Sequence, residues 1–226
     1  MSTQTKFRLK MPLWYAPIQI FKDLKQKLKA KYQPLYGLRL YCGLQGYGKT
    51  YCMIHDVIEL AIKYPDILVM SNMMINYPFN NFMIIDNVND ICNQDNRGEQ
   101  GTIVVLDEVQ NFLYAGDRSF PPELLSEITQ QRKQHMTIFG TTQVFTRCSK
   151  ELREQTYKVI NPHTLLGCIT FVRECNPFVK DGEIKDSFGI YKFYGVQSDD
   201  VRNAYNTLKK PNTLSRLHNY NTKLIK

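Results

Sequence analysis

One eight-residue segment constrains the fold of this chain more than any other feature. Residues 43–50 read Gly-Leu-Gln-Gly-Tyr-Gly-Lys-Thr and match the pattern G-x-x-x-x-G-K-[ST] at every fixed position. Residues 36–42 before it alternate and then become apolar, which predicts a strand. Residues 49–63 after it carry apolar side chains at helical spacing until a Tyr-Pro pair ends the run. A strand, a glycine-rich turn and a helix in this order predict a phosphate-binding loop, and they disfavour a chance match in an ordinary turn.

The composition of this segment has a chemical explanation. Glycines allow backbone N–H groups to surround a phosphate, and a helix N-terminus adds the positive end of its dipole. Lys49 is expected to reach the β- and γ-phosphates of a nucleotide, and the Thr50 hydroxyl is expected to bind Mg²⁺. The predicted nucleotide-binding residues are Gly43, Gln45, Gly46, Tyr47, Gly48, Lys49, Thr50 and Tyr51.

A pair of carboxylates follows the most apolar segment of the chain. Residues 102–106 read Thr-Ile-Val-Val-Leu, which predicts a central parallel strand, and Asp107 and Glu108 come directly after it. Ligands bind at this carboxyl end of strands in open α/β sheets. We expect Asp107 to hold Mg²⁺ through water and Glu108 to be the general base that activates a water molecule. The alternative, an ordinary surface Asp-Glu pair, is less consistent with the preceding phosphate-binding loop.

A third polar group ends another expected strand. Residues 136–140 are mostly apolar and are followed by Thr-Thr-Gln. Gln143 would then lie beside the γ-phosphate, where it could orient water or report the nucleotide state. The alternative is an ordinary glutamine between a strand and a loop.

Strand and helix patterns alternate over residues 36–145, which indicates an α/β protein with a mostly parallel central sheet. A short strand is expected at 67–71, a short strand or helix at 82–85, and a helix at 122–133. An appended hairpin is expected, with strands at 164–172 and 187–196 joined by a turn containing Asp181-Gly182. We divide the chain into a basic arm (1–35), a nucleotide-binding domain (36–200) and a basic tail (201–226).

Composition and charge narrow the function classes. The chain has 226 residues, 43% of them apolar, which is enough for a sizeable core. It has no apolar run long enough to cross a bilayer, no secretory signal pattern, and six cysteines without a C-x-x-C pair, so we expect a soluble intracellular protein with free thiols. The net charge of +8 is uneven: residues 1–35 carry +7 and residues 201–226 carry +6. Two basic ends around an acidic body suggest a polyanionic partner.

The basic arm also has helical spacing. Ile18, Phe21, Leu24 and Leu28 fall on one face after Pro17, with lysines on the other faces. A basic amphipathic helix of this kind docks on a membrane or a partner. The alternative is a helix packed on the core of its own domain.

Taken together, these motifs resemble the HerA/FtsK superfamily. The specific part is the Asp-Glu-Val-Gln sequence at 107–110, a Phe-Pro-Pro segment, a predicted helix ending in Gln-Arg-Lys-Gln-His (131–135), and the strand that ends at Gln143. Within the superfamily the chain is most similar to the zonula occludens toxin-like proteins of filamentous phages and to viral genome-packaging ATPases. The resemblance covers roughly residues 36–160.

This resemblance implies a RecA-like P-loop core of the ASCE type, ATP as the nucleotide, a homohexameric ring, and ATP-driven, sequence-independent movement of DNA. The absence of a transmembrane anchor favours packaging of a viral genome into a preformed capsid over export of filamentous-phage type. The N-terminal helix would meet the capsid vertex or a membrane surface, and the protein would act in the host cytoplasm or in the virion. Ring ATPases need an arginine from the neighbouring subunit, for which Arg132, Arg147 and Arg153 are candidates, with Arg132 preferred.

Two further function classes stay open at this stage. A P-loop kinase for a small molecule would hydrolyse ATP only with its acceptor. A nucleotide-binding scaffold would have no need of Glu108. The response of the ATPase rate to DNA discriminates among these possibilities.

Overall fold

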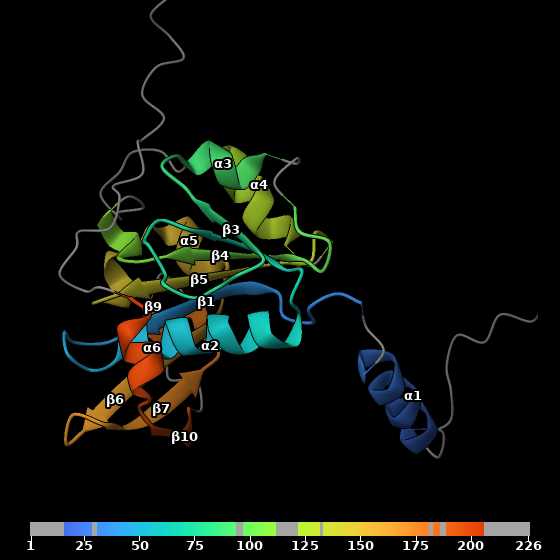
Figure 1. The fold of residues 1–226 in the computed structure, drawn as a ribbon. Helices are drawn as coiled ribbons and strands as arrows, with labels where there is room; N and C mark the ends of the chain where they lie inside the picture. Colours follow the sequence, from blue (N-terminus) through green and yellow to red (C-terminus); the bar gives the residue numbers. More distant parts are fainter. Residues whose placement is uncertain are drawn as a thin grey trace, which may run out of the picture.

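The computed structural model describes residues 16–28, 31–93, 97–111, 122–131, 133–180, 183–185 and 189–205. Its centre is an eight-stranded sheet in the order β10-β7-β6-β1-β5-β4-β2-β3 (Figure 1). Six strands run parallel, and β7 and β10 extend the sheet in antiparallel pairing. The strands are β1 (Gly37–Cys42), β2 (Leu68–Ser71), β3 (Asn81–Ile84), β4 (Thr102–Leu106), β5 (Met136–Thr142), β6 (Thr156–Leu165), β7 (Ile169–Cys175) and β10 (Ile190–Val196).

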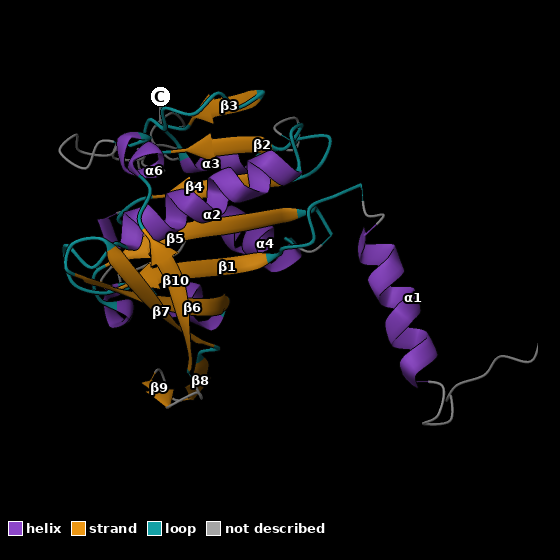
Figure 2. Ribbon diagram, turned by 60° about the horizontal axis from the view of Figure 1, so that its bottom comes forward, coloured by secondary structure: helices purple, strands orange, loops and turns teal. Residues whose placement is uncertain are grey.

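Helices cover both faces of the parallel part of the sheet (Figure 2). Parallel strands that are buried on both faces are almost continuously apolar, and β4 shows this pattern with all five of its residues buried. The described helices are α1 (Ala16–Leu28), α2 (Lys49–Lys63), α3 (Val88–Cys92), α4 (Pro122–Gln130), α5 (Lys150–Glu154) and α6 (Asp199–Asn203), with short 3₁₀ turns η2 (Val109–Asn111) and η3 (Phe145–Arg147).

Two hydrophobic clusters fill the space between the sheet and its helices. Tyr41, Phe139 and Ile160 point to one face and pack with α2. Leu40 and Ile138 point to the opposite face and pack with residues of α3, α4 and α5. The alternation along β1 therefore assigns neighbouring residues to different clusters.

The structure confirms the α/β fold, a mostly parallel sheet and the antiparallel pairing of the two expected hairpin strands, and it corrects the limits of these strands and the connection between them. The strand predicted at 164–172 spans the end of β6, a turn and the start of β7. The turn is made by Leu166 and Gly167, both with positive φ (50° and 72°), in an apolar stretch that looks continuous in the sequence. β6 itself was not predicted. β7 pairs with β10, while β8 (Phe178–Lys180) and β9 (Glu183–Lys185) form a separate two-stranded sheet, and the predicted turn at 181–182 lies outside the described residues.

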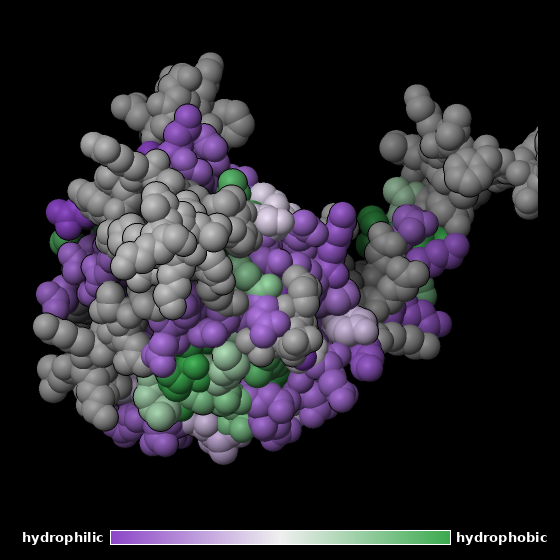
Figure 3. All heavy atoms as spheres, turned by 90° about the horizontal axis from the view of Figure 1, so that it is seen from above, coloured by the Kyte–Doolittle hydropathy of each residue, from purple (hydrophilic) through white to green (hydrophobic). Residues whose placement is uncertain are grey.

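The N-terminal helix is present, and in Figures 1 and 2 it stands apart from the sheet. Ile18 and Phe21 are exposed on it, at 43% and 69%. The predicted amphipathic helix is therefore confirmed, whereas packing of these two side chains on their own domain is not observed. Among the described residues, no helix is long and apolar enough to cross a membrane. On the face seen in Figure 3, hydrophilic and hydrophobic residues are interspersed, and the largest hydrophobic area lies near the lower edge of the domain.

Candidate active site

The predicted phosphate-binding loop connects β1 to α2. Gly43, Gly46 and Gly48 have φ values of 153°, 82° and 88°, a region that side chains with a Cβ rarely adopt. Gly48 caps α2, and the Cys52 N–H donates to its carbonyl oxygen at 2.9 Å. The loop therefore curls back at the N-terminus of a 15-residue helix, where free N–H groups point outward.

Lys49 lies inside this loop. Its Nζ donates a hydrogen bond to the Leu44 carbonyl oxygen at 3.0 Å, so the ammonium group bends back over the loop. Burial lowers the pKa of Lys49, and the carboxylates of Asp107 and Glu108 act in the opposite direction. The two carboxylates therefore partly offset the effect of burial on Lys49. In a nucleotide complex, phosphate oxygens would replace the Leu44 carbonyl oxygen as the acceptor for its ammonium group.

Asp107 is held by its backbone and by its side chain. The Asn72 amide accepts from the Asp107 N–H at 2.8 Å and donates to its carbonyl oxygen at 3.1 Å. The carboxylate accepts from the Thr141 hydroxyl at 2.6 Å and forms a further hydrogen bond with Thr50. Burial raises the pKa of Asp107, and the hydrogen bond from Thr141 partly offsets this. A buried carboxylate beside a hydroxyl is a pair of oxygen ligands of the kind that Mg²⁺ prefers.

Glu108 occupies a turn with a φ of 52°, which is uncommon for a residue other than glycine. Its N–H donates to the Thr141 hydroxyl at 2.8 Å, so Thr141 bridges Glu108 and Asp107. Its carboxylate accepts from the Asn111 amide at 2.7 Å. Asn111 thus orients the Glu108 carboxylate through one of its oxygens, and the other oxygen is available to accept a proton.

A cavity of about 470 Å³ lies over these groups. Its lining includes Lys49, Thr50, Asp107, Glu108 and Gln143, so the structure brings the predicted catalytic and metal-binding side chains together. Of the predicted nucleotide-binding set, the lining also includes Gln45, Gly46, Gly48 and Tyr51 and does not include Gly43 or Tyr47.

The opposite wall of the cavity was missed by the sequence analysis. It is built by Thr164 and Gly167 from the β6–β7 hairpin and by Gln197 and Tyr205 from the C-terminal segment. The Thr164 hydroxyl donates to the Tyr47 carbonyl oxygen at 3.1 Å, which ties this wall to the phosphate-binding loop. No local pattern marks these residues, because they reach the loop through pairing between distant segments.

Gln197 completes this wall. Its amide donates to Thr164 at 3.2 Å and to Thr170 at 3.0 Å, and its oxygen accepts from Arg202 at 2.9 Å. Arg202 also donates to the Gly167 carbonyl oxygen. Asn72 and Thr141 were missed as well. The sequence offers a sign for Thr141, which comes two residues before Gln143 at the end of an expected strand. It offers no comparable sign for Asn72.

The structure describes two of the three arginines that are candidates for a role across a subunit interface. Arg132 lies outside the described residues. Arg147 ends η3 and Arg153 lies in α5, and neither is among the residues that line the cavity. Their role as a group donated to a neighbouring subunit stays a prediction.

With this geometry established, comparisons with known proteins support the fold. The N-terminal domain of zonular occludens toxin from Neisseria meningitidis superimposes with a TM-score of 0.56 at 19% identity, over 76% of this chain and all of that one. The chain has a P-loop NTPase fold. The resemblance to zonula occludens toxin-like proteins is therefore confirmed at the level of the fold.

Further solved structures match less closely. The genome packaging NTPase B204 from Sulfolobus turreted icosahedral virus 2 has a TM-score of 0.49 in its sulfate complex, at 9% identity over 70% of this chain and 96% of that one. Its complex with AMPPCP has a TM-score of 0.45, at 15% identity over 57% and 77% of the two chains. No protein-family model and none of the curated proteins match this sequence.

Proposed function

We propose that this protein hydrolyses ATP and uses the energy to move DNA, and that it packages a viral genome into a preformed capsid. The observation that carries the proposal is one cavity in which a phosphate-binding loop, its lysine and the Asp107–Glu108 pair face each other. A protein that only binds nucleotide would not need Glu108. The resemblance of residues 107–143 to packaging ATPases supports DNA as the cargo.

The roles of the side chains follow from their contacts. Lys49 would leave the Leu44 carbonyl and bind the β- and γ-phosphates. Glu108, oriented by Asn111, would take a proton from the attacking water. Gln143 would contact the γ-phosphate or its water from the exposed end of β5. Thr50 and Asp107 would hold Mg²⁺, which when bound neutralises charge on the phosphate oxygens.

The first test is the rate of ATP hydrolysis with and without DNA. Wild-type protein should hydrolyse ATP faster with DNA. Lys49→Ala should lose nucleotide binding, and Glu108→Gln should bind ATP and lose about 10²–10⁴-fold in rate, the usual contribution of a general base. Glu154→Gln, on the exposed side of α5, is the matched control. A Glu108→Gln variant with the wild-type rate contradicts the assigned base, and hydrolysis that requires a small acceptor indicates a kinase.

The second part of the proposal is a homohexameric ring with an active site completed by the next subunit. Mixtures of Glu108→Gln and Arg132→Ala, each inactive alone, should regain part of the activity at mixed interfaces, and sedimentation with nucleotide and DNA should show the ring. Fully active monomers would contradict this assembly.

A further inference from the structure

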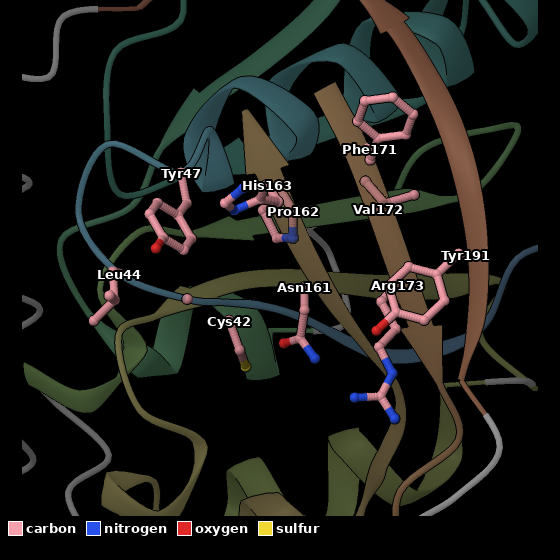
Figure 4. A pocket seen from close by; sticks show the side chains of 11 residues that line it. Cys42, Leu44, Tyr47, Asn161, Pro162, His163, Phe171, Val172, Arg173 and Tyr191 are labelled. Carbon is pink, nitrogen blue, oxygen red and sulfur yellow. The ribbon is translucent and has the colours of Figure 1, made fainter. Parts of the chain in front are cut away.

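A second cavity, of about 550 Å³, lies on the other side of the phosphate-binding loop (Figure 4). It opens on the sheet face opposite α2. Val172 points to the α2 cluster, and its neighbours Phe171 and Arg173 point to this other face. Tyr47 of the loop forms one wall, together with His163 of β6. We refer to this cavity as the aromatic groove.

Flat rings dominate the aromatic groove. Tyr47 and His163 meet edge to face with ring centroids 4.9 Å apart. Phe171 contacts Phe193, which lies on the same face of β10, with centroids 5.4 Å apart. Phe171, Phe193 and Tyr191 are 37%, 63% and 74% exposed. Single exposed apolar residues are common on protein surfaces, but exposed rings that adjoin each other on two neighbouring strands indicate a binding surface.

The lining of the aromatic groove also includes a cation, Arg173. The Arg173 guanidinium lies 5.6 Å from the centroid of the Tyr191 ring, and its Nε has no hydrogen-bond partner among the described groups. None of the ion pairs formed by described residues includes Arg173, and among the described residues that line the groove there is no carboxylate. An occupant that complements this lining is flat, aromatic and anionic.

We propose that the aromatic groove binds a single strand of nucleic acid, with bases stacked on Tyr191 and Phe171 and a phosphate paired with Arg173. Every base has a π-face, so stacking of this kind tolerates any sequence. The bases of a duplex are already stacked on each other and cannot reach the rings. The choice of DNA as the natural strand rests on the proposed function.

The position of the groove links strand binding to the nucleotide site. Tyr47 lines the groove, while its neighbours Gly46 and Gly48 line the phosphate cavity. The loop between the two cavities is one continuous backbone, so a strand that contacts Tyr47 and a nucleotide that contacts Gly46 and Gly48 act on the same segment. A strand bound in the groove would thus change the phosphate-binding loop directly, which would explain stimulation of ATP hydrolysis by DNA.

The test measures binding of the full chain to two labelled oligonucleotides of equal length by fluorescence anisotropy. One is oligo-dT and the other has the same backbone with abasic sites, which keeps the phosphates and removes the bases. We expect oligo-dT to bind at least about tenfold more tightly, in line with stacking of one or two bases. Equal affinity for both oligonucleotides would overturn the proposal.

Variants then locate the binding site. Tyr191→Ala should weaken oligo-dT binding about tenfold and leave the abasic affinity unchanged, whereas Arg173→Gln should reduce the salt slope for both by about 0.7. Tyr36→Ala, an exposed tyrosine before the opposite end of β1, should change neither affinity. The Lys49→Ala variant, inactive in ATP hydrolysis under the proposed function, should keep oligo-dT binding, so failure of the two proposals is distinguishable.

Two outcomes would contradict the assignment of the groove. Wild-type oligo-dT affinity in Tyr191→Ala and Phe171→Ala would place single-strand binding elsewhere. A change of oligomeric state in these variants at unchanged oligo-dT affinity would show that the face is an interface between copies of this chain.

Discussion

At the residue scale, the phosphate-binding loop tolerates no side chain at Gly48. A Cβ there would lie 2.7 Å from the Thr164 hydroxyl oxygen, and the φ of 88° already disfavours residues other than glycine. Gly46 has a similar φ of 82° but has no atom within 4 Å of the position of a Cβ. A comparison of the two glycines therefore separates the effect of backbone strain from the effect of a contact with Thr164 of β6.

Alanine substitutions at these positions test this difference. Gly46→Ala should lower the free energy of unfolding by about 1–2 kcal/mol, because alanine is disfavoured in the left-handed conformation. Gly48→Ala should cost clearly more and should also weaken nucleotide binding, because the loop or the Thr164 hydroxyl must move. Urea denaturation and nucleotide titration measure both effects. Equal losses for the two variants would show that the contact with Thr164 is unimportant.

Asp107 gives a prediction about pH. Burial raises its pKa in the folded protein above the ordinary value of 3.8, so ionisation of this carboxyl group disfavours the folded state. The free-energy penalty is absent below the unfolded pKa and is complete above the folded pKa. Asp107→Asn removes the penalty and keeps an acceptor for Thr141. Its melting temperature should exceed that of the nucleotide-free wild type at pH 7.5, by a margin that shrinks toward pH 4.

The control for this experiment is Asp66→Asn, at an exposed aspartate. Its melting temperature should follow the wild type at every pH. A destabilised Asp107→Asn protein at pH 7.5 would mean that the hydrogen bonds of the carboxylate outweigh its burial.

At the scale of elements, a half-buried polar cluster attaches β10 to α2. The Asp56 carboxylate accepts hydrogen bonds from the hydroxyls of Tyr41 and Tyr194, and Tyr194 also contacts His55 Nδ1 at 2.8 Å. Burial, and then the charge of Asp56, raise the pKa of both phenols, so both hydroxyls stay protonated donors. Since α2 carries the phosphate-binding loop at its N-terminus, this cluster connects the antiparallel strands to the site.

Removing one donor tests the cluster. Tyr194→Phe should lower the free energy of unfolding by about 1.5–3 kcal/mol, because it removes a hydrogen bond to a charged group and keeps the ring. Tyr191→Phe, on the same strand with an exposed ring, should change it by less than about 0.5 kcal/mol. Denaturation curves give both values. Equal stability of the two variants would contradict a structural role for the cluster.

At the scale of the whole molecule, the described fold continues to Tyr205, which lines the nucleotide cavity, while Ala204 is buried beside it. A truncation that tests the basic tail should therefore begin at residue 206 rather than at 201. Residues 206–226 still carry five Lys/Arg and no acid.

Removal of 206–226 should weaken DNA binding and preserve nucleotide binding, because Tyr205 and the other residues that line the nucleotide cavity are retained. If all five cations contact phosphates of a duplex, the plot of log affinity against log salt should become less steep by roughly 4–5. Removal of 1–30 should instead release the protein from anionic vesicles or capsids, because the apolar residues of α1 have no use on DNA. This truncation retains Gln33, which is buried and donates to the His135 carbonyl oxygen. An unchanged salt slope without 206–226 would place the DNA contacts elsewhere.

The sequence by itself determined the part of the site whose residues are close together along the chain. The loop at 43–50, the helix at 49–63 and the strand at 102–106 with its two carboxylates were all predictable, since glycine conformations, helical spacing and β-branched runs act locally. α2 and β4 have the predicted limits. The meeting of Lys49 with Asp107 followed from the rule that parallel strands end at one edge.

Only the tertiary structure decided what surrounds these groups. Asn72 and Thr141 hold Asp107 across 35 and 34 residues of sequence, and Thr164 reaches Tyr47 across 117. Sheet pairing brings these residues together, and pairing depends on register between distant strands, which a local pattern does not contain. The same reason applies to the aromatic groove. Pairing of the strands at 164–172 and 187–196 was predicted, but the register that places Phe171 and Tyr191 on one face of β7 and β10 was not.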